Sequence, residues 1–141
     1  PPRVPGNVAV VTAADGPHLQ AIREDMTEAG NTVFETTPAE HDAAMETVQA
    51  GAHTAVLAYA LAADSVREEF ATPVSAQLES IATTVTEGDP GVYAEIQSTF
   101  DGAEGVADAA QAIANADDEA FADLYNEAKD ALSVDGRERH Q

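Results

Sequence analysis

The stretch TPAEHDAAMETVQAGAHTAVLAYAL, from Thr37 to Leu61, marks the point where the chain changes from strands to helices. Thr37 can cap a helix that has Pro38 at its first position, and Glu40 at the third position would complete a capping box. Apolar residues then recur at helical spacing, which predicts a long amphipathic helix. Its apolar stripe consists of Met45, Val48, Ala52, Val56 and Tyr59.

The segment before this stretch alternates between strand and helix patterns. Residues 7–12 and 31–36 are typical of short strands, and residues 18–29 of a helix that ends at Gly30. A strand, a helix and a second strand within about thirty residues predict a parallel βαβ unit. Two strands make a poor sheet alone. We therefore interpret residues 1–36 as the edge of a larger α/β domain whose start lies before Pro1.

The segment after this stretch is helical. Thr72-Pro73 and Asp89-Pro90 repeat the start signal for two more helices, and residues 106–114 and 118–132 fit the last two. The inward face of the final helix is predicted from four residues, Phe121, Leu124, Tyr125 and Ala128. The fold class is therefore mainly α, with a helical domain over residues 37–135 after a short βαβ segment, and a flexible tail over 136–141.

The chain of 141 residues has a net charge of −20, from 26 acidic and 6 basic residues. We interpret this as the acidic surface of a halophilic protein; the alternatives are a nucleic-acid mimic and an acidic metal-binding surface. Because no basic patch is present to neutralise phosphates, we expect no binding of nucleic acid. The longest apolar run, residues 55–63, is too short to span a bilayer, and no signal peptide is readable. There are no cysteines, and we expect a cytoplasmic protein without membrane contact.

Gln49 and His53 are the candidate site residues on the long helix. They are four residues apart and share a face. The structural interpretation is a half-buried histidine at a helix contact, and the functional one is a polar pair that lines a ligand cleft. Similarly, His41 and Asp42 either cap the helix and face solvent, or fix the joint between the sheet and the helices.

Several familiar sites lack support in this chain. His41 and His53 lie about three helical turns apart, so we expect no metal site. The nucleophile-elbow, dinucleotide-binding and P-loop fingerprints are all missing. The residues alone therefore describe an α/β edge and a helical domain with one polar seam, and they name no reaction.

A resemblance to a family adds to this description. The pattern P-x-E-H-D-x-x-M-x-x-V-Q-A-x-x-H over residues 38–53 is similar to the start of the helical domain of prephenate dehydrogenases, in particular of the forms fused to chorismate mutase. T-P-V at 72–74 and D-P-x-V-Y-A-E-I at 89–96 resemble that family's S-P-I and D-P-x-L-Y-A-D-I at matching separation. The opening P-G-N-V-A-V-V-T resembles the last stretch of the family's nucleotide-binding domain. This implies that residues 1–36 are the carboxyl-terminal edge of a nucleotide-binding α/β domain of the Rossmann type. The resemblance covers roughly residues 5–100.

The resemblance implies an oxidoreductase of tyrosine biosynthesis, a branch of aromatic amino acid biosynthesis. The family oxidatively decarboxylates prephenate to 4-hydroxyphenylpyruvate and passes hydride to NAD or NADP held by an N-terminal Rossmann domain. The helical domain closes the substrate cleft and joins two subunits into a homodimer. It also implies that the catalytic residues and the nucleotide fingerprint lie outside this chain, so the chain alone is expected to be inactive. The resemblance leaves three choices open. The cofactor can be NAD or NADP, the substrate can be prephenate or arogenate, and tyrosine can be an inhibitor or not.

Carried over position by position, Gln49 and His53 match cleft-facing residues of the family. Thr84 occupies the position of an arginine that grips a substrate carboxylate, and Ala76 occupies that of another arginine. A guanidinium is the natural partner of a carboxylate, whereas a threonine offers one weaker hydrogen bond. Thr84 is thus a substrate-binding candidate that departs from the pattern. The departure leaves two alternatives, a noncatalytic helical dimerisation module and a regulatory module that senses tyrosine through the His53 seam.

Overall fold

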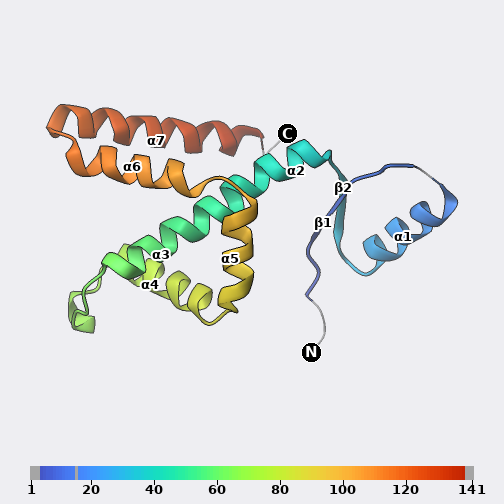
Figure 1. The fold of residues 1–141 in the computed structure, drawn as a ribbon, viewed down its shortest axis with the longest axis horizontal. Coiled ribbons are helices and arrows are strands. Elements are labelled where there is room, and N and C mark those ends of the chain that lie inside the picture. The colour runs from blue at the N-terminus through green and yellow to red at the C-terminus, as the bar shows by residue number, and fades with distance from the viewer. Residues whose placement is uncertain (1–3, 15, 139–141) are drawn as a thin grey trace.

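The computed structural model describes residues 4–14 and 16–138, and these residues are mainly helical with a two-stranded sheet (Figure 1). The mainly α fold class is therefore confirmed. The elements in chain order are β1 (Asn7–Val10), α1 (Pro17–Glu28), β2 (Thr32–Glu35), α2 (Pro38–Met45), the π-helical segment η1 (Glu46–Gly51), α3 (Ala52–Ala62), the short 3-10 turn η2 (Glu68–Phe70), α4 (Pro73–Thr86), α5 (Pro90–Thr99), α6 (Ala103–Asn115) and α7 (Asp118–Glu138).

The amino-terminal unit is the predicted parallel βαβ. β1 and β2 pair in parallel from Asn7 opposite Thr32 to Val10 opposite Glu35. Both strands are shorter than the expected 7–12 and 31–36, because the paired residues of the parallel ladder end at Val10 and Glu35. Gly30 ends the turn after α1 with a φ of +91°, a conformation that favours glycine.

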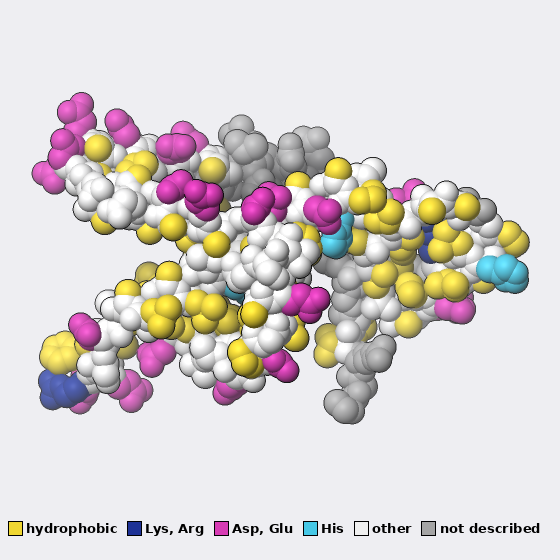
Figure 2. Space-filling model, in the orientation of Figure 1, with side chains coloured by type: hydrophobic (Ala, Val, Ile, Leu, Met, Phe, Trp, Pro, Cys, Tyr) yellow, Lys and Arg dark blue, Asp and Glu magenta, His cyan; other side chains and the backbone are white. Residues whose placement is uncertain are grey.

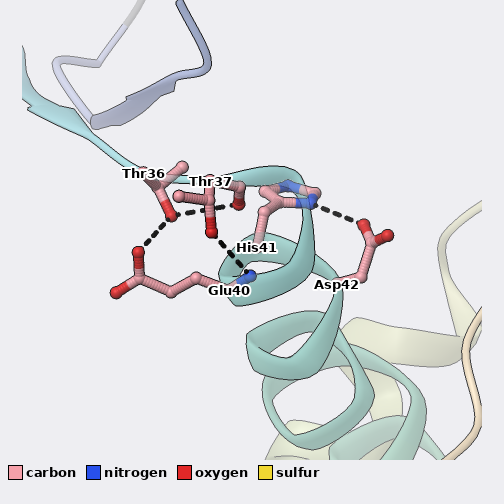
Figure 3. A network of polar contacts seen from close by, with 5 residues as sticks. All are labelled: Thr36, Thr37, Glu40, His41 and Asp42. Carbon is pink, nitrogen blue, oxygen red and sulfur yellow. Dashed lines mark hydrogen bonds and ion pairs between the residues drawn. The ribbon is translucent and has the colours of Figure 1, made fainter.

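The long helix over residues 38–62 is continuous but not regular. We expected one α-helix, and the structure places the π-helical segment η1 in its middle. The hydroxyl of Thr37 accepts a hydrogen bond from the backbone N–H of Glu40 at 3.2 Å, as predicted. The prediction that Glu40 completes a capping box was wrong. The Glu40 carboxylate instead accepts a hydrogen bond from the Thr36 hydroxyl at 2.8 Å (Figure 3). That contact ties the start of α2 to the chain directly after β2.

The next two helices begin as the sequence predicts. Thr72 and Ser75 form a reciprocal capping box at the start of α4, and the Asp89 carboxylate accepts from the backbone N–H of Gly91 at 2.7 Å at the start of α5. At the carboxyl end, α7 continues through Glu138, so residues 136–138 of the expected tail are helical in the structure. Residues 139–141 lie outside the described part of the chain.

Little apolar surface is buried within one chain. The buried hydrophobic residues of the described part are Ala50 and Ala82. The accessible surface is 11369 Å², whereas a compact monomer of this mass exposes about 6,900 Å². Phe121 and Tyr125, predicted to face inward from α7, are 49% and 65% exposed. In Figure 1, α7 runs along the outer side of α6. The single chain therefore leaves an apolar surface without cover.

The shape explains this excess of surface. α6 and α7 form an antiparallel hairpin that projects from the long helix, and α3 and α4 pack together below it (Figure 1). Figure 2 shows an open wedge between these two arms, with hydrophobic side chains along both of its edges. The βαβ unit lies at the opposite end of the long helix.

Candidate functional site

The best-buried polar contact in the helical part lies where α5 meets the π-helical segment. The side-chain amide of Gln97 donates to the backbone carbonyl of Ala50 at 3.0 Å. The carbonyl oxygen of the same side chain accepts from the hydroxyl of Thr54 at 3.2 Å. Gln97 is half-buried and Ala50 is fully buried. One side chain of α5 therefore holds two neighbouring turns of the long helix.

Two glycines let the α5–α6 corner approach the same segment. A methyl group at Gly102 would overlap the backbone carbonyl oxygen of Glu46 and would lie 3.1 Å from the backbone nitrogen of Gly51. Gly102 also has a φ of +148°, which other residues rarely adopt. The corner thus packs main chain against main chain, directly on the π-helical turn.

His53 and Tyr93 form the aromatic part of the site. Their rings meet edge to face with centroids 4.7 Å apart and an interplanar angle of 79°. On its other side, the Tyr93 ring lies against Gly88, where an added methyl group would come within 2.7 Å of the ring. The buried Nδ1 of His53 has no hydrogen-bond partner in the described residues. His53 is thus a half-buried histidine at a helix contact, with one ring nitrogen that none of the described groups uses.

A pocket opens beside this aromatic pair. It has a volume of about 380 Å³ and lies between α3, the end of α4 and α5. Leu57, Val85 and Pro90 give it an apolar lining, and Tyr93 and Gln97 bring polar atoms to its wall. Its composition suits an apolar or aromatic group better than a charged one.

The predicted site residues occupy different surroundings. Gln49 is half-buried inside the π-helical segment, and His53 contacts α5 as described. Thr84 is exposed on α4, and its hydroxyl donates to the backbone carbonyl of Ser80 at 3.1 Å. The structure therefore joins His53 to α5, while the hydroxyl of Thr84 is already engaged with its own helix.

Gln97 is the residue that sequence reasoning missed. It directly follows the D-P-x-V-Y-A-E-I motif and lies four residues after Tyr93, so both share one face of α5. A polar residue on the face that carries the motif's tyrosine was the available signal.

His41 and Asp42 lie at the start of α2 (Figure 3). His41 Nδ1 is 3.2 Å from the Asp42 carboxylate, and its ring meets that of Phe100 edge-on at 6.5 Å. Phe100 directly follows α5, so His41 connects the start of α2 to the end of α5. The contact with the sheet is made by Glu40 instead.

The carboxyl ends of β1 and β2 border a second hollow of about 310 Å³. The guanidinium of Arg23 donates to the Thr12 hydroxyl at 2.6 Å and pairs with the Glu35 carboxylate there. Ligands of α/β sheets bind at such an edge. The nucleotide-binding features are missing, because the β1–α1 loop contains the single glycine Gly16 and α1 begins with Pro17, which has no N–H for a phosphate. The residues present do not fit NAD or NADP.

The described residues contain no group of three metal-ligating side chains. Within the same ranges, no helix is both long enough and apolar enough to cross a membrane.

No protein-family model and no solved structure matches the chain. A curated oxidoreductase does match it, and this similarity supports the prephenate dehydrogenase family. The relative is a 4-amino-4-deoxyprephenate dehydrogenase from Streptomyces pristinaespiralis, 32% identical over an alignment 146 residues long that includes 93% of this chain. The chain spans about half, 49%, of that relative's length.

Proposed function

We propose that this chain is the carboxyl-terminal part of an NAD(P)-dependent dehydrogenase of the prephenate type. The observation that carries the proposal is the similarity to a dehydrogenase of this class along 93% of the chain. The motifs at residues 38–53 and 89–96 also support it. In the complete enzyme the reaction would be the oxidative decarboxylation of a cyclohexadienyl dicarboxylate, prephenate itself leading to 4-hydroxyphenylpyruvate.

The proposed role of this chain is structural and substrate-binding. The βαβ unit has no phosphate-binding loop, so the nicotinamide cofactor and the catalytic groups belong to the other half of the enzyme. The helical part supplies one wall of the substrate cleft, with Gln49, His53 and Thr84 as its candidate residues. The chain alone would not transfer hydride.

The candidate substrates differ either in the group at ring position 4 or in the side chain. Prephenate, arogenate and 4-amino-4-deoxyprephenate are the candidates, the last because the relative's name specifies it. Thr84 offers no free hydroxyl proton for a carboxylate, since it donates to Ser80. Arg67 borders the same hollow as Ala76 and Ser80, with its guanidinium 4.9 Å from the Phe70 ring centroid. Arg67 is therefore our candidate for the cation that α4 lacks.

We propose a homodimer on the basis of the uncovered surface. The excess over a compact monomer is about 4,500 Å², several times the 800 Å² that each partner buries in a standard interface. We propose that the second copy covers the α6–α7 hairpin, and that the other half of the enzyme covers part of the remainder. Cytoplasmic location and adaptation to high salt belong to the same proposal, the latter on the net charge of −20.

The test is nicotinamide reduction by the full-length protein in concentrated salt. Prephenate, arogenate and 4-amino-4-deoxyprephenate are each offered with NAD and with NADP. Turnover with one of them establishes the dehydrogenase and its substrate. No turnover by a folded dimer would reject the proposal.

A second candidate is a noncatalytic dimerisation or tyrosine-sensing module. The engaged hydroxyl of Thr84 and the methyl side chain of Ala76 favour it, because neither position can grip a carboxylate as an arginine would. A rise in Tm with tyrosine, in a protein that does not turn over, would select the sensing module.

A further inference from the structure

Gln97 joins α5 to two points of the long helix, Ala50 inside the π-helical segment and Thr54 directly after it. We propose that Gln97 is a positioning residue that holds this segment in its π-helical form, and thereby sets the direction in which Gln49 faces the substrate cleft. This inference rests on the proposed function, which makes Gln49 a cleft residue.

The first argument is that the π-helical segment needs support from outside. A π-helical turn is rare and is found mostly as a single turn at functional sites. Here it lies between two α-helices of ordinary pattern, α2 and α3. Its end is held from two directions, by the Gln97 amide on Ala50 and by the close approach of Gly102 to Glu46 and Gly51.

The second argument is burial. Ala50 is fully buried, so water cannot take the place of the Gln97 amide on its carbonyl oxygen. Losing the amide therefore removes a hydrogen bond without replacement. The helix can respond by returning to the regular α-helical pattern, which needs no such support.

The third argument concerns direction. Each residue of an α-helix turns the chain by about 100° around the helix axis. A π-helical turn contains one residue more than an α-helical turn. Its loss would therefore rotate the side chains before the segment relative to those after it. Gln49 lies within the segment, and His53 lies after it. Releasing the π-helical turn would therefore reorient Gln49 while His53 keeps its contact with Tyr93.

The experiment compares Gln97→Leu, Gln49→Ala and the double variant in the full-length protein. The control is Gln111→Leu, which changes an exposed glutamine of α6. We expect KM to rise about two- to tenfold in each single variant with kcat unchanged, the factor that corresponds to one lost neutral hydrogen bond. The double variant should then be no worse than either single variant, because both remove the same contact.

A second measurement is independent of activity. With isotope-labelled glutamine, the side-chain amide resonance of Gln49 should shift in Gln97→Leu and stay in place in Gln111→Leu. KM increases that multiply in the double variant, or an unshifted Gln49 resonance in folded Gln97→Leu, would overturn the inference. If the wild type turns over no candidate substrate, the proposed function fails, and the Gln49 resonance alone decides the positioning role.

A further variant covers the case in which Gln97→Leu does not fold. Gln97→Glu keeps the volume and the acceptor for Thr54, and it removes the donor to Ala50. The same two measurements apply to it. A normal KM together with an unshifted Gln49 resonance in this variant would equally overturn the inference.

Discussion

Gly102 packs directly against the backbone carbonyl of Glu46, with no room for a side chain between the α5–α6 corner and the long helix. The contact requires glycine for two reasons, the close approach and the φ of +148°. It fixes where the α6–α7 hairpin leaves the helical part.

Gly102→Ala should lower the free energy of unfolding by about 3 kcal/mol, because it combines overpacking against main chain with a strained φ. Gly105→Ala is the matched control. It lies three residues further along in α6 with open space around it, so it should stabilise by about 0.5–1 kcal/mol through helix propensity. Urea unfolding of the full-length protein measures both changes. Equal stability of the two variants would show that the corner moves to accommodate a methyl group.

The sequence predicted the helix starts well because each depends on a few neighbouring residues. Thr37-Pro38, Thr72-Pro73 and Asp89-Pro90 each begin a helix in the structure. The π-helical segment escaped prediction because Gln97 and Gly102, far along the chain, lie against it. Local spacing carries no sign of such contacts.

The candidate site was predicted only in part, for the same reason. Helical spacing brought out His53, and its partner Tyr93 lies in a motif that the sequence displays. The predicted inward face of α7 depended on a neighbour, and a periodic pattern does not reveal whether that neighbour belongs to the same chain. In one chain Phe121, Tyr125 and Ala128 of this face are exposed, and Leu124 is half-buried.

The exposed face of α7 leads to a prediction about assembly. Phe121→Glu combined with Tyr125→Glu should shift the protein from dimer toward monomer, because it places two charges in an apolar contact. Asn126→Glu is the control, since it adds a charge at an exposed polar position of the same helix. Light scattering in high salt gives the mass of each. If the double variant remains as dimeric as the control, α7 is not part of the interface.

The net charge of −20 predicts that stability depends on salt. At low ionic strength the acidic side chains repel one another over about 30 Å, and at 1 M salt this range falls to about 3 Å. Dilution from concentrated salt should therefore reduce helicity and lower Tm. Circular dichroism follows the transition, and a neutral osmolyte at matched osmolality serves as the control. A signal that stays constant through the dilution would remove the case for salt adaptation.

Arg67 is the subject of the last prediction, because positive charge is scarce in the helical part. Between residues 37 and 133 the sequence contains only Arg67 and Lys129 as basic residues. Arg67 borders a hollow with Ala76 and Ser80, although Glu79 also lines it and would weaken the attraction for an anion.

If Arg67 grips a substrate carboxylate, Arg67→Ala should raise KM about tenfold or more, since a charge-assisted hydrogen bond contributes about 1.5–3 kcal/mol. Arg67→Lys should recover only part of this loss, because an ammonium cannot form the bidentate pair. Lys129→Ala removes the same charge from α7 and should leave KM unchanged. Steady-state kinetics of the full-length protein with its best substrate separates these cases. Equal KM values in Arg67→Ala and Lys129→Ala would assign the carboxylate to a cation of the other half or of the second subunit.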